Sequence, residues 1–381
     1  MSGLAPLRGH EDVRSALARA VRAGELPGSL LLHGPPGVGK QRLALWLGQL
    51  LLCERPGVEP CGECRSCRLS LHLQHPDLHW FFPIERPKGG GSPEKLAEGM
   101  EEERARQLAQ IREQPLRTLV SDKPIGFFIQ QMQTLRRVTA SRPAMGSRKV
   151  FVIGDAELLV PQESSPDAAN VLLKLLEEPP ADTTVLLTAS DPDELLPTIR
   201  SRLLPIRVRA LPADDVARFL VEQRGISADA ANRVARLAQG SIGHALGFLP
   251  DGGEPGPLEK RRADARLLLD AAASPRAEAR FAAALRVGPA GARGVFSDVL
   301  ELLAVWVRDL AAVAAGAAET VVNVDALPEL EALAARLPDA SAAAPRMVRL
   351  VEEARTLAHG NVNPQLTLAN LLRGLSEALS S

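Results

Sequence analysis

The sequence predicts an α/β domain with a mostly parallel sheet, followed by two regions made only of helices. Short apolar runs alternate with helix-like segments up to about residue 210, which is typical of a parallel sheet covered by helices. A glycine-rich turn joins the first apolar run to a helix, and no strand-like run follows Pro212. We therefore expect an α/β domain over 1–210, a small helical domain over 211–250 and a helical bundle over 258–381.

Composition excludes several classes of protein. The 381 residues are 45% hydrophobic and 24% charged, as in soluble globular proteins. Lysine plus arginine (45) balances aspartate plus glutamate (46), so any role with nucleic acid must depend on local patches or partner subunits. Aromatic residues are only 3%, which weighs against base stacking. No apolar run reaches the roughly 18 residues of a membrane span, and the N-terminus has no signal-peptide pattern, so we expect a cytoplasmic protein.

The first segment of the chain leads into a phosphate-binding turn. Residues 7–26 form an amphipathic pattern that predicts a helix, and Pro27-Gly28 ends it before the apolar run 29–33. Glycine N–H groups, a helix N-terminus and a lysine together bind phosphate in a P-loop. The glycines and the lysine that match the spacing of the P-loop motif here are Gly34, Gly37, Gly39 and Lys40. The motif normally ends in a Ser or Thr that binds Mg²⁺, whereas Gln41 stands here, so the P-loop is degenerate.

All four cysteines of the chain fall within fifteen residues, at Cys53, Cys61, Cys64 and Cys67. Disulfides are rare in the cytosol, and cysteines two residues apart bridge poorly. A tetrahedral structural zinc site would use all four thiolates and leave no open position for catalysis. Zinc is the preferred interpretation, with free or redox-active cysteines as the alternative.

The rest of the sequence predicts the other strands and helices. Residues 84–117 combine a glycine-rich linker with a charged helix and predict a solvated surface insertion without an assigned function. Strands are expected at 78–83, 150–153, 184–190 and 204–208, and helices at 124–141, 166–178, 213–224, 228–239 and 242–249. Residues 258–379 are expected to hold four or five long helices.

The strand at 150–153 ends where P-loop ATPases carry an acidic pair that organises magnesium and the attacking water. Gly154 takes the first of these positions and Asp155 the second. Gln41 and Gly154 count as two independent losses of the same function, which predicts that hydrolysis is absent. Nucleotide binding through the loop backbone and Lys40 stays open.

At this point the motifs resemble a known family, the clamp-loader branch of the AAA+ ATPases. Within it the chain is most similar to the non-hydrolysing stator subunits of the bacterial DNA polymerase III clamp loader. The resemblance extends from the N-terminal segment to the last helical region, and 84–117 fits it least well. The segments that carry it are the P-loop, the four cysteines, His75-Pro76-Asp77, the run Leu173-Lys174-Leu175-Leu176-Glu177-Glu178-Pro179-Pro180, Ser201-Arg202 and Asn361-Val362-Asn363-Pro364.

The resemblance implies roles for individual residues. The four cysteines would be ligands of a small zinc module. Ser201-Arg202 matches the first two residues of a Ser-Arg-Cys motif, with Leu203 in place of the cysteine. Arg202 would then be an arginine finger that reaches the ATP of a neighbouring subunit. Gly243 stands where an ATPase subunit carries a second sensor arginine, and Ser190 stands at the first sensor position.

The fold implied is an AAA+ P-loop domain, a helical lid and a helical collar. The function implied is a subunit that helps to load a sliding clamp onto primed DNA, in a complex with delta and gamma/tau subunits. One alternative is an active ATPase subunit of the same branch that uses Lys40 and Asp155. A stand-alone zinc-dependent DNA-binding protein is disfavoured by the neutral charge and the few aromatic residues.

Overall fold

The structure is a computed structural model that describes residues 3–85, 93–116, 125–159, 167–286, 293–336, 340–358 and 362–380. Two compact units make up the chain. The first comprises the described residues of 1–118, 125–225 and 239–243, and the second those of 226–238 and 244–381. The division into an α/β domain, a lid and a collar stays a prediction. Among the described residues, no helix combines the length and the apolarity that crossing a membrane requires.

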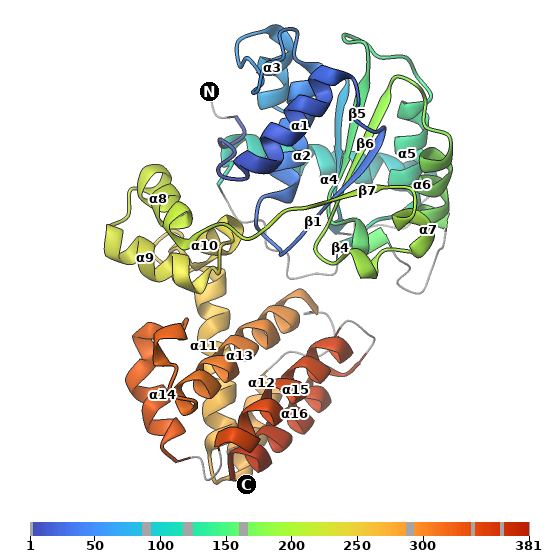
Figure 1. The fold of residues 1–381 in the computed structure, drawn as a ribbon. Coiled ribbons are helices and arrows are strands. Elements are labelled where there is room, and N and C mark those ends of the chain that lie inside the picture. The colour runs from blue at the N-terminus through green and yellow to red at the C-terminus, as the bar shows by residue number, and fades with distance from the viewer. Residues whose placement is uncertain are drawn as a thin grey trace. The chain divides into compact units, whose positions relative to one another are not determined.

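The first unit is built on a five-stranded sheet in which every neighbouring pair of strands is parallel. The strand order is β2-β5-β6-β1-β7 (Figure 1). The strands are β1 (Ser29–His33), β2 (Leu78–Phe81), β5 (Lys149–Ile153), β6 (Thr183–Ala189) and β7 (Leu204–Arg207). The predicted parallel α/β fold is therefore confirmed.

Helices cover both faces of the sheet because successive strand residues point to opposite sides. Leu30 and Leu32 pack in one core with α1 and α2, whereas Leu31 packs in the other core with α5, α6 and α7. These two cores account for the continuous apolar character of the strands. The helices of this unit outside the insertion are α1 (Glu11–Ala23), α2 (Lys40–Leu52), α3 (Arg65–Leu71), α5 (Ile129–Thr139), α6 (Asp167–Glu177), α7 (Pro197–Arg200) and α8 (Ala213–Arg224).

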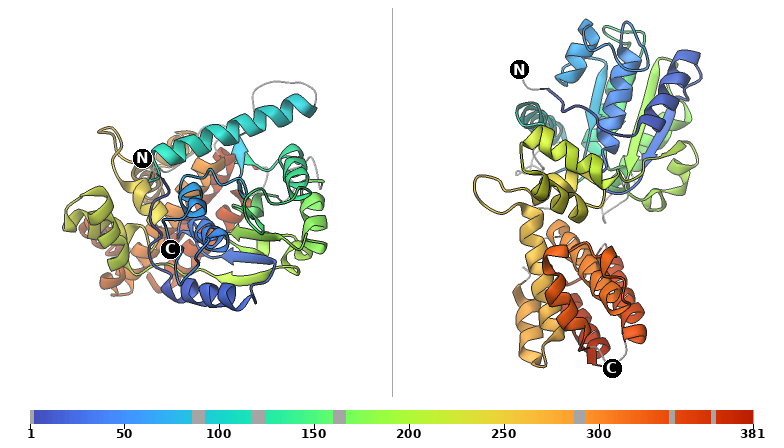
Figure 2. Two further views of the ribbon diagram at one scale, coloured as in Figure 1. Left: turned by 90° about the horizontal axis from the view of Figure 1, so that it is seen from above. Right: turned by 60° about the vertical axis from the view of Figure 1, so that its left-hand side comes forward.

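The insertion leaves and rejoins the unit at one place. The short strands β3 (Ile84–Glu85) and β4 (Ile125–Gly126) pair antiparallel, and α4 (Pro93–Glu113) lies between them in the chain. Figure 2 shows α4 as a long helix along one side of the unit. The expected surface insertion also has an apolar anchor, because α4 buries Met100 in a small cluster with Phe82 and Ile84. The linker residues 86–92 and residue 117 lie outside the described residues.

The sheet topology brings the expected site residues to one edge. β1 lies between β6 and β7, so the P-loop leaves the sheet beside the end of β6. β5 pairs with the other side of β6, which places Asp155 near Thr188, whose Oγ accepts the Asp155 N–H at 3.0 Å. Ligands of parallel α/β sheets bind at the carboxyl ends of the strands.

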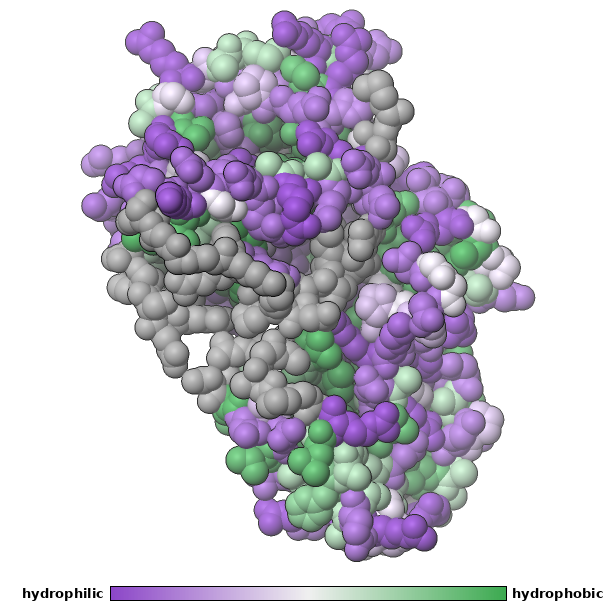
Figure 3. Space-filling model, turned by 180° about the vertical axis from the view of Figure 1, so that it is seen from behind, coloured by the Kyte–Doolittle hydropathy of each residue, from purple (hydrophilic) through white to green (hydrophobic). Residues whose placement is uncertain are grey.

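The second unit is helical, and its described residues after 256 include four long helices, α11, α13, α15 and α16, in agreement with the four or five long helices expected. Two shorter helices, α12 and α14, have 10 and 8 residues. Figure 3 shows green, apolar side chains on the surface of this unit. Phe281 and Leu285 of α12 are large apolar residues that are 63% and 66% exposed. The helices are α9 (Ala228–Leu237), α10 (Ile242–Phe248), α11 (Pro257–Ala273), α12 (Ala277–Arg286), α13 (Arg293–Ala314), α14 (Leu327–Ala334), α15 (Ala340–Ala358) and α16 (Pro364–Ser380).

A buried arginine joins three segments of the helical unit. Arg262 of α11 stacks on Trp306 of α13 and donates to Asn323 at 2.6 Å and to Asp325 at 2.6 Å. Asn323 in turn donates to the buried carboxylate of Asp309. A buried charge needs such partners, so this network fixes the loop before α14 to the bundle.

The His75-Pro76-Asp77 motif has a structural explanation. The Asp77 N–H donates to His75 Nδ1 at 3.0 Å. The Asp77 carboxylate accepts the N–H groups of Ala144, Met145 and Gly146 at 2.6–3.0 Å. Burial raises the pKa of Asp77, but these three donors outweigh burial and lower the pKa below its ordinary value. The motif therefore fixes the loop that leads into β5.

Asp77→Asn is expected to destabilise the protein by about 1–3 kcal/mol at pH 7, because three backbone N–H groups lose the charged acceptor that the buried Asp77 provides. A carboxyl with a lowered folded pKa stabilises the folded state above its unfolded pKa of about 4 and loses this effect as pH falls through the folded pKa. The difference in the free energy of unfolding between wild type and variant should therefore shrink below about pH 4. Denaturant unfolding at several pH values measures it, with the exposed Asp264→Asn as control. A gap that stays constant with pH would contradict this explanation.

Candidate functional site

The P-loop has the backbone that its glycines allow. Gly34, Gly37 and Gly39 have φ values of 152°, 70° and 102°, in the region that other residues rarely adopt. A Cβ on Gly34 would lie 1.9 Å from the carbonyl oxygen of Val208, so the loop passes directly against the segment after β7. The predicted glycine positions are therefore required by backbone geometry and by packing.

Lys40, the first residue of α2, is buried and uses all its donors within the chain. Its Nζ donates to the carbonyl oxygens of Gly34 at 2.8 Å and Pro35 at 2.9 Å, and to Ser190 Oγ at 3.3 Å. An ammonium group has three N–H donors, so each has an acceptor. A phosphate at this loop would have to displace some of these contacts.

Gln41 and Gly154 are one coupled feature, which corrects the interpretation of two independent losses. Gln41 Nε2 donates to Asp155 Oδ2 at 2.9 Å, and Gln41 Oε1 accepts from Trp80 Nε1 at 3.1 Å. A Cβ on Gly154 would lie 2.5 Å from Gln41 Oε1. The glutamine side chain therefore occupies the space that an aspartate at 154 would need. The tryptophan on β2, which the sequence did not single out, completes this arrangement.

Charge at the loop is balanced between the buried Lys40 and two partly buried carboxylates. Burial lowers the pKa of Lys40, and the carboxylates of Asp155 and Glu157 oppose that change. Burial raises the pKa of Asp155, and Lys40 and the Gln41 hydrogen bond oppose it. Asp155 also has a φ of 48°, a left-handed conformation that aspartate tolerates better than most residues. Asp155 is thus held as an acceptor for Gln41.

Gly243 lies against the P-loop. Its N–H donates to the Gly37 carbonyl oxygen at 3.0 Å, and a Cβ at Gly243 would lie 3.0 Å from Gly37 Cα. Any side chain here would press on backbone, which moves less readily than the end of a side chain. A glycine at 243 therefore lets its backbone lie directly against the P-loop.

Ser201 and Arg202 lie elsewhere on the unit, and neither has a described hydrogen bond to the P-loop residues. Ser201 Oγ donates to the Thr198 carbonyl oxygen at 3.2 Å. Arg202 Nη1 donates to the same oxygen at 2.7 Å, and Nη2 donates to Glu177 Oε1 at 2.7 Å. The side chain of Arg202 is 34% exposed, so part of the guanidinium faces solvent.

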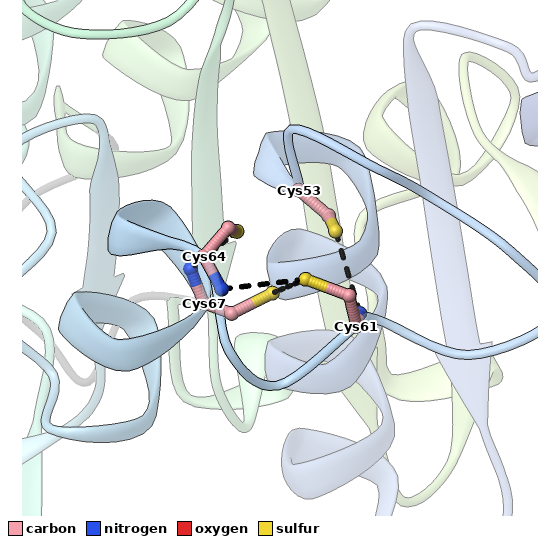
Figure 4. Close-up of side chains that lie close together, drawn as sticks. All are labelled: Cys53, Cys61, Cys64 and Cys67. Carbon is pink, nitrogen blue, oxygen red and sulfur yellow. Dashed lines mark hydrogen bonds between the residues drawn. The ribbon is translucent and has the colours of Figure 1, made fainter.

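The four cysteines form the second candidate site. Figure 4 shows their sulfur atoms turned toward one another between the end of α2 and the start of α3. All four Sγ atoms lie within 4.8 Å of one another. Four sulfurs bound to one zinc ion at about 2.3 Å would lie about 3.8 Å apart. The cluster can therefore hold a metal ion such as zinc with small side-chain movements.

Backbone N–H groups around the cluster suit thiolate ligands. Arg55 and Cys61 donate to Cys53 Sγ at 3.4 Å, Cys64 donates to Cys61 Sγ at 3.4 Å, and Cys67 donates to Cys64 Sγ at 3.3 Å. Such donors lower the pKa of Cys61 to about 6, whereas burial raises the pKa of Cys53 and Cys67. Hydrogen bonds to the sulfur atoms also orient metal ligands. The surroundings therefore fit the metal that the spacing predicts.

Two family models match the sequence. One, described as DNA polymerase III, delta subunit, covers residues 9–212, which is more than half of the chain. The other, described as DNA polymerase III, delta subunit, C terminal, covers residues 290–377. The matches include the P-loop, the cysteines, Arg202 and most of the helical bundle.

Individual relatives agree with these models. The chain is 34% identical to the DNA polymerase III subunit delta' of Pseudomonas aeruginosa over 55% of this chain and 52% of the relative. It is 31% identical to the Escherichia coli subunit delta' over 60% of this chain and 57% of the relative. A gamma/tau subunit of Mycobacterium tuberculosis matches at 27% over 60% of this chain and 33% of the relative. The chain thus spans about half the length of the delta' relatives.

Among solved structures, a DNA polymerase III gamma subunit-related protein of Thermotoga maritima aligns over 95% of this chain and 98% of that chain. The sequence identity is 18% and the TM-score is 0.40, so this likeness is too distant to carry an argument.

The cysteine cluster gives a prediction that does not depend on the P-loop. The purified chain is expected to carry about one zinc per chain, and Cys64→Ser should lose it, because three thiolates leave the tetrahedral shell incomplete. Elemental analysis after dialysis measures the metal. Ser66→Ala, in the first turn of the helix that Cys64 caps, is the control and should keep the zinc. Wild-type protein that is folded and free of metal would contradict the assignment.

Proposed function

The chain belongs to the DNA polymerase III delta-subunit family, and we propose that it is a delta-prime-type subunit of a clamp loader that does not hydrolyse ATP itself. It assembles with delta-type and gamma/tau-type subunits and helps them to load a sliding clamp onto primed DNA, in the cytoplasm with the replication machinery. The observation that carries this proposal is the pair of hydrogen bonds made by the Gln41 amide. Its nitrogen donates to Asp155, and its oxygen accepts from Trp80.

The lack of hydrolysis follows from the metal chemistry. Magnesium in P-loop ATPases is held by the hydroxyl at the end of the P-loop and by an aspartate at the end of the neighbouring strand. Position 41 offers only a side-chain oxygen that already accepts from Trp80, and Gly154 offers no side chain. Lys40 retains the positive charge of a phosphate site, but its donors are used by loop carbonyls and Ser190. ATP bound here would have no protein group to organise its magnesium.

The cysteines are proposed to hold zinc in a structural role. Four thiolates fill the tetrahedral shell, so no position is open for a reacting water. When bound, the zinc ion would only cross-link the four cysteines. The cysteines themselves join the end of α2 to the start of α3, through the segment 53–67.

Arg202 is proposed as the residue that takes part in the chemistry, in trans. A guanidinium is always charged and can donate two parallel hydrogen bonds to phosphate, which suits the charge that develops during phosphoryl transfer. Arg202 is partly exposed, and its guanidinium is free of any described contact with the P-loop of its own chain. Ser201 beside it hydrogen-bonds to the turn that carries the arginine.

A second candidate is an active, gamma/tau-like ATPase that uses Lys40 and Asp155. The matches to gamma/tau subunits and the electrostatic attraction between Lys40 and Asp155 favour it. This candidate is tested on the isolated chain.

The isolated chain with Mg-ATP and primed DNA is expected to release phosphate no faster than its Lys40→Ala variant, because magnesium lacks its protein ligands. A coupled phosphate-release assay measures the rate. Turnover by the wild type that Lys40→Ala abolishes would instead establish the ATPase candidate.

In a reconstituted loader, Arg202→Ala is expected to reduce the DNA-stimulated ATPase rate severalfold or more, because a neighbouring active site loses its trans-acting charge. Thermal unfolding and co-elution with the other subunits should be unchanged. Arg200→Ala is the matched control, since Arg200 is also exposed but pairs with Asp193. Equal rates for wild type and Arg202→Ala would refute the arginine-finger role.

A further inference from the structure

Two motifs that lie apart in the sequence meet at Arg202. Glu177 is the last residue of α6, and its Oε1 accepts from Arg202 Nη2 at 2.7 Å across 25 residues of chain. The Thr198 carbonyl oxygen accepts from Nη1 at 2.7 Å. The guanidinium therefore donates hydrogen bonds to two groups of its own chain.

The backbone that carries Arg202 is also fixed. Ile199 and Leu203 on either side of it are 0% and 6% exposed and belong to the core under α6 and α7. Leu203, which replaces the cysteine of the family motif, takes part in this anchoring. Contacts within the chain fix both the main chain around Arg202 and its guanidinium. The side chain therefore has a defined orientation before a partner subunit binds.

The Arg202–Glu177 pair is poorly placed to stabilise the fold. The two side chains are 34% and 48% exposed, and ion pairs on the surface contribute little to stability because water screens them. A guanidinium has five N–H donors, of which these contacts use two. Donors therefore remain for phosphate oxygens while Glu177 stays in place.

From this geometry we infer that Glu177 is a positioning residue for Arg202 and holds the guanidinium in the orientation in which it meets the phosphates of ATP on a neighbouring subunit. The inference rests on the proposed function of Arg202. A flexible arginine would lose rotamer freedom on reaching the phosphates, whereas one held beforehand has less to lose. The exposed carboxylate of Glu178, next in the sequence, has no described bond to Arg202 and provides a matched control.

The test uses the complete loader, reconstituted with wild-type or variant chain, with the clamp, primed DNA and a range of ATP concentrations. Glu177→Ala should lower kcat by about 3- to 10-fold with little change in the KM for ATP, because orientation matters in the transition state and the ATP-binding subunit is unaltered. Glu177→Gln keeps an acceptor oxygen and should recover part of the rate. Glu178→Ala should match the wild type, and thermal unfolding should be equal for all of them.

A double variant separates the possible failures. In the Arg202→Ala background, Glu177→Ala should add no further loss, because its effect acts through the arginine. An Arg202→Ala loader that works normally would refute the arginine finger itself. A loader that is impaired by Arg202→Ala but unaffected or accelerated by Glu177→Ala would refute only the positioning role. Additive losses in the double variant would also overturn it, since Glu177 would then act independently.

Discussion

The side chain of Gln41 controls the P-loop site through its two hydrogen bonds. Its amide nitrogen donates to Asp155 after β5, and its amide oxygen accepts from Trp80 on β2. A Cβ at 154 would meet this amide, so any side chain there would require the glutamine to move and leave its hydrogen bonds. Two positions that organise magnesium in an ATPase are thus replaced together by one internal contact. The buried carboxyl of Asp155 is thereby used for structure.

This arrangement separates the two groups that meet in a phosphoryl-transfer site. Lys40 is buried and bonded to its own loop, whereas Arg202 is partly exposed and bonded to Glu177 and Thr198. The lysine is therefore used inside the unit, whereas part of the arginine faces solvent. Gly243 can approach Gly37 closely because it has no side chain.

The sequence predicted the parallel sheet and the helices near 213–224, 228–239 and 242–249 correctly, because apolar runs and glycine turns reflect local geometry. The cysteine cluster was also predicted, since its spacing permits one metal ion. Other features depend on contacts between distant segments and could not be predicted. Gln41 and Gly154 looked independent because nothing in a linear pattern shows that one fills the space left by the other. The packing of α4 through Met100 and the pairing of Glu177 with Arg202 likewise depend on the folded arrangement.

The P-loop residues also contribute packing and hydrogen bonds that do not depend on phosphate. A side chain at Gly34 would collide with the Val208 carbonyl, and one at Gly243 would press on Gly37. Lys40 donates to the carbonyl oxygens of the buried Gly34 and the exposed Pro35, and the buried oxygen would be costly to leave without a donor. Replacing these residues would therefore cost stability even in a chain that never meets ATP. A glycine-rich turn with a lysine is evidence for this strand-to-helix connection, and the residues at 41 and 154 decide whether hydrolysis accompanies it.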